Sequence, residues 1–241
     1  MALFGRVLVV AGSDSGGGAG IQADSKTCLA LGVHASTALT ALTAQNTLGV
    51  HGVLPVPPDF VRRQMEAVLS DSGADAVKTG MLGNAGVIEV VRGVLAGRGL
   101  PLVLDPVMVA KGGAALLDPA ALDALRGLIP LASVLTPNVP EAEALLGRAI
   151  VDDGAVVRAA LDLLALGAGA VLLKGGHLAG PVVRDVLVTR GTVTVLENPR
   201  VETRHTHGTG CTLASAIAAG LAQGTTLEAA VRRQRWRMNS V

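Results

Sequence analysis

The chain has 241 residues, of which half are hydrophobic and 16% are charged, and its formal net charge at pH 7 is +1. This composition excludes an intrinsically disordered protein and fits one large α/β domain over residues 1–241. The near-neutral charge, together with one Trp, two Phe and no Tyr, offers neither the basic surface nor the stacking side chains of a nucleic-acid-binding protein.

A membrane span is not expected, although the mean hydropathy is +0.51. Residues 27–58 carry no Asp, Glu, Lys or Arg, but amides, histidines and prolines interrupt them, whereas a spanning helix needs about 20 continuous apolar residues. Residues 1–6 lack the basic and apolar regions of a secretory leader.

Cys28 and Cys211 are too few for a disulfide framework, so both are expected as reduced thiols. We expect a cytoplasmic protein that binds a small molecule and has no membrane or nucleic-acid partner.

The first half of the chain alternates short apolar runs with helical patterns. Arg6–Val10 is a β-branched run that predicts a buried parallel strand, and Ile21–Leu31 predicts the helix after it. Further helices are predicted at Pro58–Leu69, Asn84–Ala96 and Pro119–Leu128, and further strands at Ala76–Lys78, Leu102–Leu104 and Val134–Leu135. This alternation is typical of βαβ units on a parallel sheet.

The second half continues the pattern and then departs from it. Helices are predicted at Pro140–Leu146, at Gly154–Leu166, from Gly208 to about Gln223 and from about Leu227, and a strand at Ala170–Leu173. Val182–Thr189 and Thr192–Leu196, separated by Arg190-Gly191, predict an antiparallel hairpin. No linker, charge block or repeat divides the chain, which favours a single domain.

A glycine-rich loop, Gly12–Gly20 (GSDSGGGAG), follows the first predicted strand and precedes the first helix. Its glycines let backbone amides approach a ligand closely. The loop contains no Gly-Lys-Ser/Thr, so it is not a P-loop, and it fits the dinucleotide fingerprint only loosely. A tight turn without a ligand is the structural alternative.

A second motif, His205–Thr212 (HTHGTGCT), precedes the helical segment Leu213–Leu221. Amides from Gly208 to Cys211 would point out of the helix N-terminus, where the unpaired donors and the helix dipole favour a phosphate. The Cys211 thiol would lie beside a transferring phosphoryl group, and the helix N-terminus is expected to lower its pKa; a small buried cysteine is the alternative. His205 and His207 could form half of a metal site, but the lack of a third ligand favours structural, hydrogen-bonded histidines.

Polar side chains also follow three later strands. Asp105 ends one of them and Glu141 begins the helix after another, so both carboxylates could meet at the carboxyl edge of the sheet as Mg²⁺ ligands, usually through water. The alternative for Glu141 is a first-turn carboxylate that favours the helix dipole. Lys174 follows the strand Ala170–Leu173 and could neutralise a phosphate, or be a solvated loop lysine.

Seven motifs in order closely resemble the hydroxymethylpyrimidine/phosphomethylpyrimidine kinases of the ribokinase-like superfamily, over about residues 6–231. In the superfamily's Asn-x-x-Glu motif the first and last residues are Asn138 and Glu141. The seven are AGSDSGGGAGIQAD (11–24), ALTAQNTLGV (41–50), KTGMLG (78–83), VLDPVMVAKGG (103–113), TPNVPEAEALLG (136–147), LLKGGH (172–177) and THGTGCT (206–212).

The resemblance implies a three-layer α/β/α fold with a mostly parallel central sheet, a homodimer, and two phosphoryl transfers from ATP with Mg²⁺ in thiamine biosynthesis. The first would convert 4-amino-5-hydroxymethyl-2-methylpyrimidine to its monophosphate, and the second would form the diphosphate. The implied site residues are Cys211, Gly208, Thr209 and Gly210 for catalysis, Gln45, Gly12, Met81 and Val107 for the pyrimidine, Lys174 and Asn138 for the nucleotide, and Asp105 and Glu141 for the metal.

Three alternatives stand beside this interpretation. Pyridoxal kinases share much of the fold, so vitamin B6 phosphorylation is the nearest of them. A pyrimidine-binding protein without catalysis is the second, and a dinucleotide-binding oxidoreductase, resting on the glycine loop alone, is the third. The Arg-rich segment 232–241 departs from the family, in which a Gly- and His-rich tail usually follows; this suggests a truncated or altered C-terminus, with a basic surface tail as the alternative.

Overall fold

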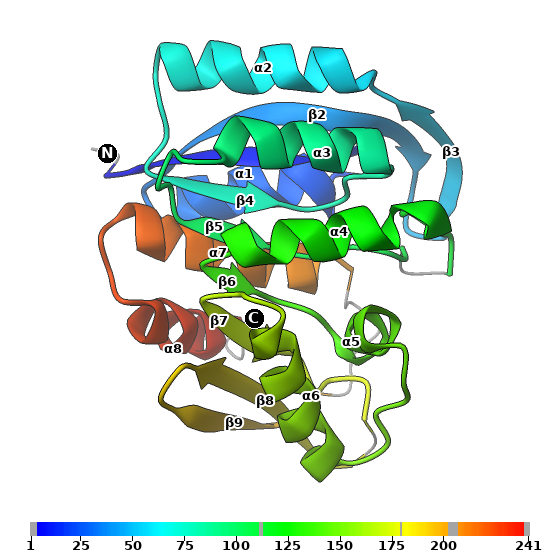
Figure 1. Cartoon of the computed structure of the whole chain (residues 1–241), viewed down its shortest axis with the longest axis vertical. Coiled ribbons are helices and arrows are strands. Elements are labelled where there is room, and N and C mark those ends of the chain that lie inside the picture. Colours follow the sequence, from blue (N-terminus) through cyan, green and yellow to red (C-terminus); the bar gives the residue numbers. More distant parts are fainter. Residues whose placement is uncertain (1–3, 111–112, 179, 202–206, 239–241) are drawn as a thin grey trace.

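In the computed structural model of the chain, the described residues are 4–110, 113–178, 180–201 and 207–238, the last five of these for their backbone alone. Within them, nine strands form one sheet in the order β3-β2-β1-β4-β5-β6-β7-β8-β9 (Figure 1). The strands are β1 Arg6–Asp14, β2 His34–Gln45, β3 Val50–Pro55, β4 Ala76–Thr79, β5 Leu102–Leu104, β6 Val134–Leu135, β7 Ala170–Leu173, β8 Val182–Thr189 and β9 Val193–Pro199.

The centre of this sheet is parallel. Strands β2, β1, β4, β5, β6 and β7 pair in parallel, whereas β3 on one side and β8 and β9 on the other pair antiparallel. The chain starts at β1 and builds first toward β2 and then, from β4 on, in the opposite direction. A crevice for a ligand is expected where the order reverses, at the carboxyl ends of β1 and β4.

Helices cover both faces of the sheet (Figure 1). They are α1 Gly20–Ala30, α2 Pro58–Ser70, α3 Ala85–Leu95, α4 Leu122–Leu128, α5 Val139–Leu146, α6 Asp153–Ala165, α7 Thr209–Ala222 and α8 Leu227–Met238, with the 3₁₀ turns Pro119–Ala121 and Ile129–Leu131 around α4. Strand β1 shows how the two layers form, because Leu8 and Val10 point into the core under α2 to α6, while Val7 and Val9 point into the core under α1, α7 and α8. The three-layer α/β/α fold is confirmed.

The sequence located most of these elements and missed two. The strands at 76, 102, 134 and 170 and the antiparallel hairpin of β8 and β9 are where the sequence predicted them. Strand β1 runs on through Gly12 to Asp14, so part of the predicted glycine loop is strand. Strands β2 and β3 were not predicted, because His34–Gln45 mixes Ala, Thr and Ser without a clear apolar alternation, and β3 is exposed over most of its length.

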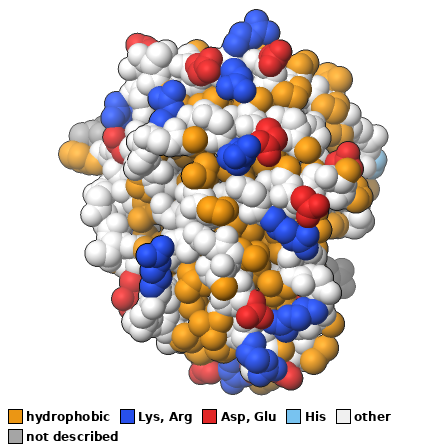
Figure 2. Space-filling model, in the orientation of Figure 1, with side chains coloured by type: hydrophobic (Ala, Val, Ile, Leu, Met, Phe, Trp, Pro, Cys, Tyr) orange, Lys and Arg blue, Asp and Glu red, His pale blue; other side chains and the backbone are white. Residues whose placement is uncertain are grey.

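The surface carries mixed charges. On the face in Figure 2, Lys and Arg side chains lie interspersed with Asp and Glu, and pairs such as Arg92 with Glu89 and Arg126 with Asp123 bridge neighbouring turns of α3 and α4. Exposed pairs of this kind contribute little to stability. Among the described helices, none has both the length and the apolar character that a bilayer crossing requires.

Candidate active site

A cavity of about 520 Å³ opens at the carboxyl edge of the parallel strands, where the strand order reverses. Its wall is built from the ends of β1, β2 and β4, the segments after β5 and β7, the first turn of α5 and the N-terminus of α7. Every site residue that the sequence suggested lies on this wall. They are Gly12, Gln45, Met81, Asp105, Val107, Asn138, Glu141, Lys174, Gly208, Thr209, Gly210 and Cys211.

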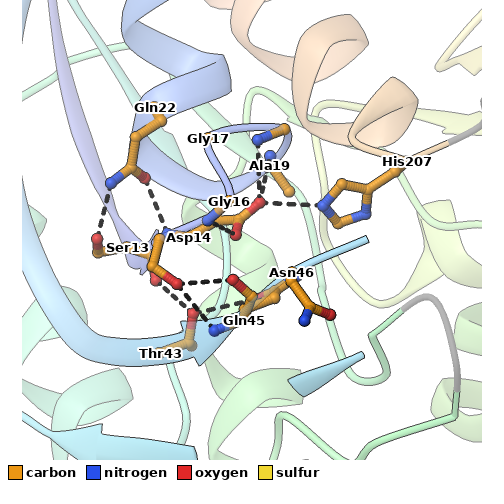
Figure 3. Close-up of polar contacts among 12 residues, drawn as sticks. Ser13, Asp14, Gly16, Gly17, Ala19, Gln22, Thr43, Gln45, Asn46 and His207 are labelled. Carbon is orange, nitrogen blue, oxygen red and sulfur yellow. Dashed lines mark hydrogen bonds and ion pairs between the residues drawn. The ribbon is translucent and has the colours of Figure 1, made fainter. Parts of the chain in front are cut away.

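The glycine-rich loop is ordered around one buried carboxylate, that of Asp14 (Figure 3). Asp14 Oδ1 accepts a hydrogen bond from the amide of Gly16 at 2.8 Å, and Oδ2 accepts from the amides of Gly18 and Ala19 at 3.1 and 2.8 Å. Burial opposes the charge, but these bonds and one from His207 hold the pKa of Asp14 below its usual value. The loop amides of Gly16, Gly18 and Ala19 therefore bind a carboxylate of the loop itself, and a ligand-binding role for the loop stays a prediction.

The N-terminus of α7 packs directly on this loop. Gly208 precedes the helix with φ +77°, and a Cβ there would lie 1.8 Å from the carbonyl oxygen of Gly18. Only glycine fits, on grounds of both conformation and space. Gly208, Thr209 and Gly210 line the cavity at the helix N-terminus, where an anion would be favoured, and the anion site at these residues stays a prediction.

Cys211 lies in this first turn with a half-buried free thiol. The sequence predicted that the helix N-terminus would lower its pKa, and this prediction is wrong. Burial raises the pKa of the Cys211 thiol; the nearby ammonium of Lys78 opposes this rise, and the carboxylates of Asp24 and Asp105 add to it. Desolvation is the largest cause of this shift, and the two nearby negative charges act in the same direction.

Sequence reasoning missed a buried ion pair beside the cysteine. Lys78, on β4, has no exposed surface, and its Nζ contacts both carboxylate oxygens of Asp24 at 2.9 Å. Ser215, one helical turn beyond Cys211, donates its hydroxyl to Asp24 Oδ1 at 2.6 Å. Burial disfavours the ammonium, but Asp24 raises the pKa of Lys78 above its usual value. The available signal was a lysine inside a predicted buried strand, where a charged side chain requires a buried partner.

The two predicted metal ligands lie together with Lys174. Lys174 Nζ is 3.1 Å from Asp105 Oδ1, and its side chain is largely buried, which excludes a solvated loop lysine. A Cβ on Gly210 would lie 3.3 Å from the same Nζ, so Lys174 stands between Asp105 and the anion site. Asp105 Oδ1 also accepts from the hydroxyl of Thr136 at 3.1 Å.

Glu141 has the capping role that was its alternative, and it also faces the cavity. Its amide donates to Asn138 Oδ1 at 2.9 Å, while its Oε2 accepts from the Asn138 amide at 2.8 Å, which forms a capping box. Burial raises the pKa of Glu141 to about 7. The nearby ammonium of Lys174 opposes this rise, and the carboxylate of Asp105 adds to it. Asn138 thus contributes its side-chain oxygen to the helix cap.

The residues suggested for the pyrimidine form a less polar part of the cavity wall. A Cβ on Gly12 would lie 3.0 Å from Met81 Sδ, so Gly12 and Met81 form one surface, and Val107 lines the same space. Gln45 is half-buried at the end of β2, where its Oε1 accepts from the Thr43 hydroxyl at 3.1 Å. An amide held in this way can offer a donor and an acceptor to the edge of a heterocycle.

His207 is the other functional residue that the sequence underrated. Its Nε2 is 3.0 Å from Asp14 Oδ2, so it is a hydrogen-bonded histidine, as the preferred interpretation held, while His205 lies outside the described residues. Across the described part of the chain, no group of three His, Cys, Asp or Glu side chains is arranged to hold a metal.

One cavity is therefore lined by the first turn of α7, where the anion site is predicted, and by two buried lysines, three carboxylates, a thiol and several apolar side chains. This set of groups suits phosphoryl transfer to a small organic acceptor, since that reaction depends on positioning and on neutralising phosphate charge. The fold and the site together define a small-molecule kinase with the ribokinase-like architecture.

Comparison with known proteins identifies the family. The sequence pattern of the phosphomethylpyrimidine kinase family matches residues 14–236, and the chain belongs to this family. It is 53% identical to the hydroxymethylpyrimidine/phosphomethylpyrimidine kinase of Streptomyces coelicolor, over 94% of this chain and 84% of the relative. It is also 53% identical to the thiamine biosynthesis bifunctional protein of Geobacter sulfurreducens, over 95% of this chain and 47% of that longer protein.

Solved structures show the same fold. The phosphomethylpyrimidine kinase of Clostridium difficile superposes with a TM-score of 0.87 at 40% identity, covering 98% of each chain. An ADP complex of Bacillus subtilis pyridoxal kinase superposes with a TM-score of 0.89 at 39% identity, covering 97% of this chain and 90% of that one. The family assignment makes this protein a kinase, which decides against the dinucleotide-binding oxidoreductase.

Proposed function

We propose that the protein transfers the γ-phosphoryl group of ATP to the hydroxyl of 4-amino-5-hydroxymethyl-2-methylpyrimidine, and then a second phosphoryl group to the monophosphate, in thiamine biosynthesis. The observation that carries the proposal is that Gln45, the apolar residues Met81 and Val107, and the first turn of α7 with Cys211 all line one cavity. The relatives that share about half of their residues with this chain carry the names of these two activities.

In the first step the pyrimidine hydroxyl oxygen attacks the γ-phosphorus, the bond to the ADP oxygen breaks, and the hydroxyl proton passes to the thiolate form of Cys211, which becomes the neutral thiol. The backbone amides of Gly208, Thr209 and Gly210 would donate hydrogen bonds that stabilise the charge developing on the phosphoryl oxygens. Lys174 is placed to neutralise the same charge, because it is held at the rim of the anion site by Asp105. In the second step the nucleophile is an ionised phosphate oxygen, so the anion site is needed but a base is not.

Asp105 and Glu141 are the residues that would hold Mg²⁺, through water and together with the nucleotide phosphates. The residues present fit this ion, because Mg²⁺ is commonly bound by one or two carboxylates and substrate phosphates rather than by a complete protein cage. When bound, the ion would neutralise phosphate charge during transfer. The two carboxylates are kept close by Lys174, whose ammonium lies beside Asp105 and attracts Glu141.

The test is a phosphoryl-transfer assay of the purified full chain with ATP, Mg²⁺ and hydroxymethylpyrimidine, followed by the monophosphate. ADP release that depends on each pyrimidine supports the proposal, and its absence with both would contradict it and favour the non-catalytic binding protein. Pyridoxal belongs in the same assay, because a pyridoxal kinase is among the most similar folds. A higher kcat/KM for pyridoxal would reassign the substrate.

Replacing Gln45 by alanine is expected to raise the KM for the pyrimidine by about 30- to 1000-fold, with a smaller change in kcat. The variant loses a paired donor and acceptor, which corresponds to about 2 to 4 kcal/mol for two hydrogen bonds and the groups left unpaired. Gln64→Ala is the matched control, because Gln64 bonds to the backbone of Leu39 and lies outside the cavity wall. Unchanged pyrimidine affinity in Gln45→Ala would remove this residue from the substrate site.

Asp105→Asn and Glu141→Gln are each expected to raise the Mg²⁺ concentration for half-maximal activity by about 10- to 100-fold, the range for residues that hold a metal through an outer shell. Glu143→Gln is the control on the same helix, since Glu143 accepts a hydrogen bond from the Ile150 amide and lies outside the cavity wall. Mg²⁺ titrations that overlay the wild-type curve for both site variants would leave Asp105 and Glu141 with structural roles alone.

Three expectations from the sequence stay predictions. They are the homodimer, the single domain over residues 1–241 and the cytoplasmic location. Light scattering of the purified protein measures the first, and the number of transitions in denaturant unfolding measures the second.

A further inference from the structure

Figure 3 shows a polar network that runs from the pyrimidine end of the cavity to the start of α7. Near Gln45, the hydroxyl of Ser15 donates to the backbone carbonyl oxygen of Gln45 at 2.7 Å and accepts from the backbone amide of Gln45 at 2.8 Å. The Thr43 hydroxyl bonds to the Ser13 carbonyl at 2.8 Å. The glycine-rich loop is therefore fastened to the strand end that presents Gln45.

The middle of the network is Asp14. Its backbone amide donates to Gln22 Oε1 at 2.8 Å, and the Gln22 amide nitrogen donates to the Ser13 hydroxyl at 2.8 Å, so β1 and α1 fix the residue from both sides. Its carboxylate collects the amides of the loop and is almost completely buried. A buried carboxylate with several donors is rigid, because every lost bond leaves a charge unpaired.

The far end is His207. A carboxylate only accepts hydrogen bonds, so the 3.0 Å contact requires a proton on His207 Nε2. His207 directly precedes Gly208, the residue that has no space for a side chain against Gly18. The imidazole therefore fixes the chain at the point where the anion site begins, and it connects segments 193 positions apart in the sequence.

We propose that His207 is a positioning residue that joins the anion site of α7 to the glycine-rich loop through Asp14, and thereby couples the pyrimidine end of the cavity to phosphoryl transfer. This proposal rests on the proposed function for its substrate, while the contact that it uses is independent of any ligand. Loss of the His207 donor should let the start of α7 and the loop move independently, and the anion site would then spend less time in register with the bound acceptor.

The first experiment uses amide hydrogen exchange of the ligand-free full chain. His207→Leu is expected to speed exchange by about tenfold, the size of one lost charge-assisted hydrogen bond, in both residues 15–20 and residues 208–215. His34→Leu is the matched control, because His34 is exposed on β2 and contacts only Ser36 among the hydrogen bonds described for its ring. Unchanged exchange at residues 15–20 in His207→Leu overturns the proposal, whether or not the protein phosphorylates a pyrimidine.

The second experiment uses kinetics. His207→Leu is expected to lower kcat by about 10- to 100-fold with the pyrimidine KM within about threefold of wild type, and His207→Gln, which keeps a side-chain N–H donor, is expected to recover part of the loss. In combination with Ser15→Ala, which removes the hydroxyl that bonds to the backbone of Gln45, the fold-changes in kcat/KM should not multiply, because both side chains belong to one network. If His207 has a purely structural role, His207→Leu should lower thermal stability and His207→Gln should not recover kcat. Strictly multiplicative fold-changes in the double variant would also contradict the coupling. A wild-type protein that turns over no pyrimidine would contradict the proposed function instead, and the exchange result would still decide the role of His207.

Discussion

Cys211→Ala is expected to slow the first phosphorylation by about 10²- to 10⁴-fold, the range attributed to general-base catalysis, and to affect the second much less. The alcohol of hydroxymethylpyrimidine must lose a proton as it attacks, and Cys211 is the titratable thiol in the first turn of α7 beside the anion site. The phosphate oxygen that attacks in the second step is already ionised. Single-turnover measurements with hydroxymethylpyrimidine and then with its monophosphate separate the two steps.

The direction of the pKa shift gives this prediction a second readout. Burial raises the pKa of Cys211, so a smaller fraction of the thiol is deprotonated at neutral pH than for an ordinary cysteine. The rate of the first step should therefore climb as the pH rises above neutral, and this climb should vanish in Cys211→Ala. Cys28→Ala is the control, since Cys28 lies on α1 and is buried in the core, where burial raises its pKa to about 12. An equal loss in both steps would make Cys211 a packing residue of the anion site.

Much of the fold could be predicted because parallel strands buried on both faces are continuous apolar runs. Leu102–Leu104 and Ala170–Leu173 are such runs, Ala76–Lys78 is apolar except for its lysine, and the structure has strands at all three. Strand β2 could not be found in this way, since its residues after Ala41 are half-buried or exposed and its polar Thr residues bond to neighbouring backbone. Its place in the sheet depends on pairing with β1, which local pattern does not encode.

The residues of the candidate site could be predicted from where the strands end. The pKa shifts of these residues could not be predicted in the same way. Asp105 and Lys174 were placed on one edge by topology alone, and the structure brings them to 3.1 Å. The pKa of Cys211 depends on Lys78 and Asp24, which lie on other elements, so the helix dipole was given too much weight. The contact between Asp14 and His207 likewise joins residues 193 positions apart, and no local sequence motif predicts it.

Lys78→Met is expected to destabilise the protein by about 3 to 5 kcal/mol, the cost of removing one partner from a buried ion pair. Methionine keeps most of the lysine volume, so the loss reports the Asp24 carboxylate left in the core without its counter-charge. Urea unfolding followed by circular dichroism at pH 7 measures the free energy of unfolding. Because the ion pair raises the pKa of Lys78, its contribution in the wild type is fully present below the usual lysine pKa and is lost only as pH rises beyond it.

A compensating variant separates the charge from the packing. In Lys78→Met/Asp24→Leu neither charge remains, and the Ser215 hydroxyl can bond to the carbonyl four residues before it in α7, so most of the lost stability should return. The exposed pair of Arg92 and Glu89 serves as the control, because Arg92→Met should change the unfolding free energy by less than about 1 kcal/mol. If the double variant is as unstable as Lys78→Met, the loss arises from the shape of the core rather than from an unpaired carboxylate. Stability, not activity, must be the readout here, since Lys78 lines the cavity beside Cys211 and its removal would change the thiol as well.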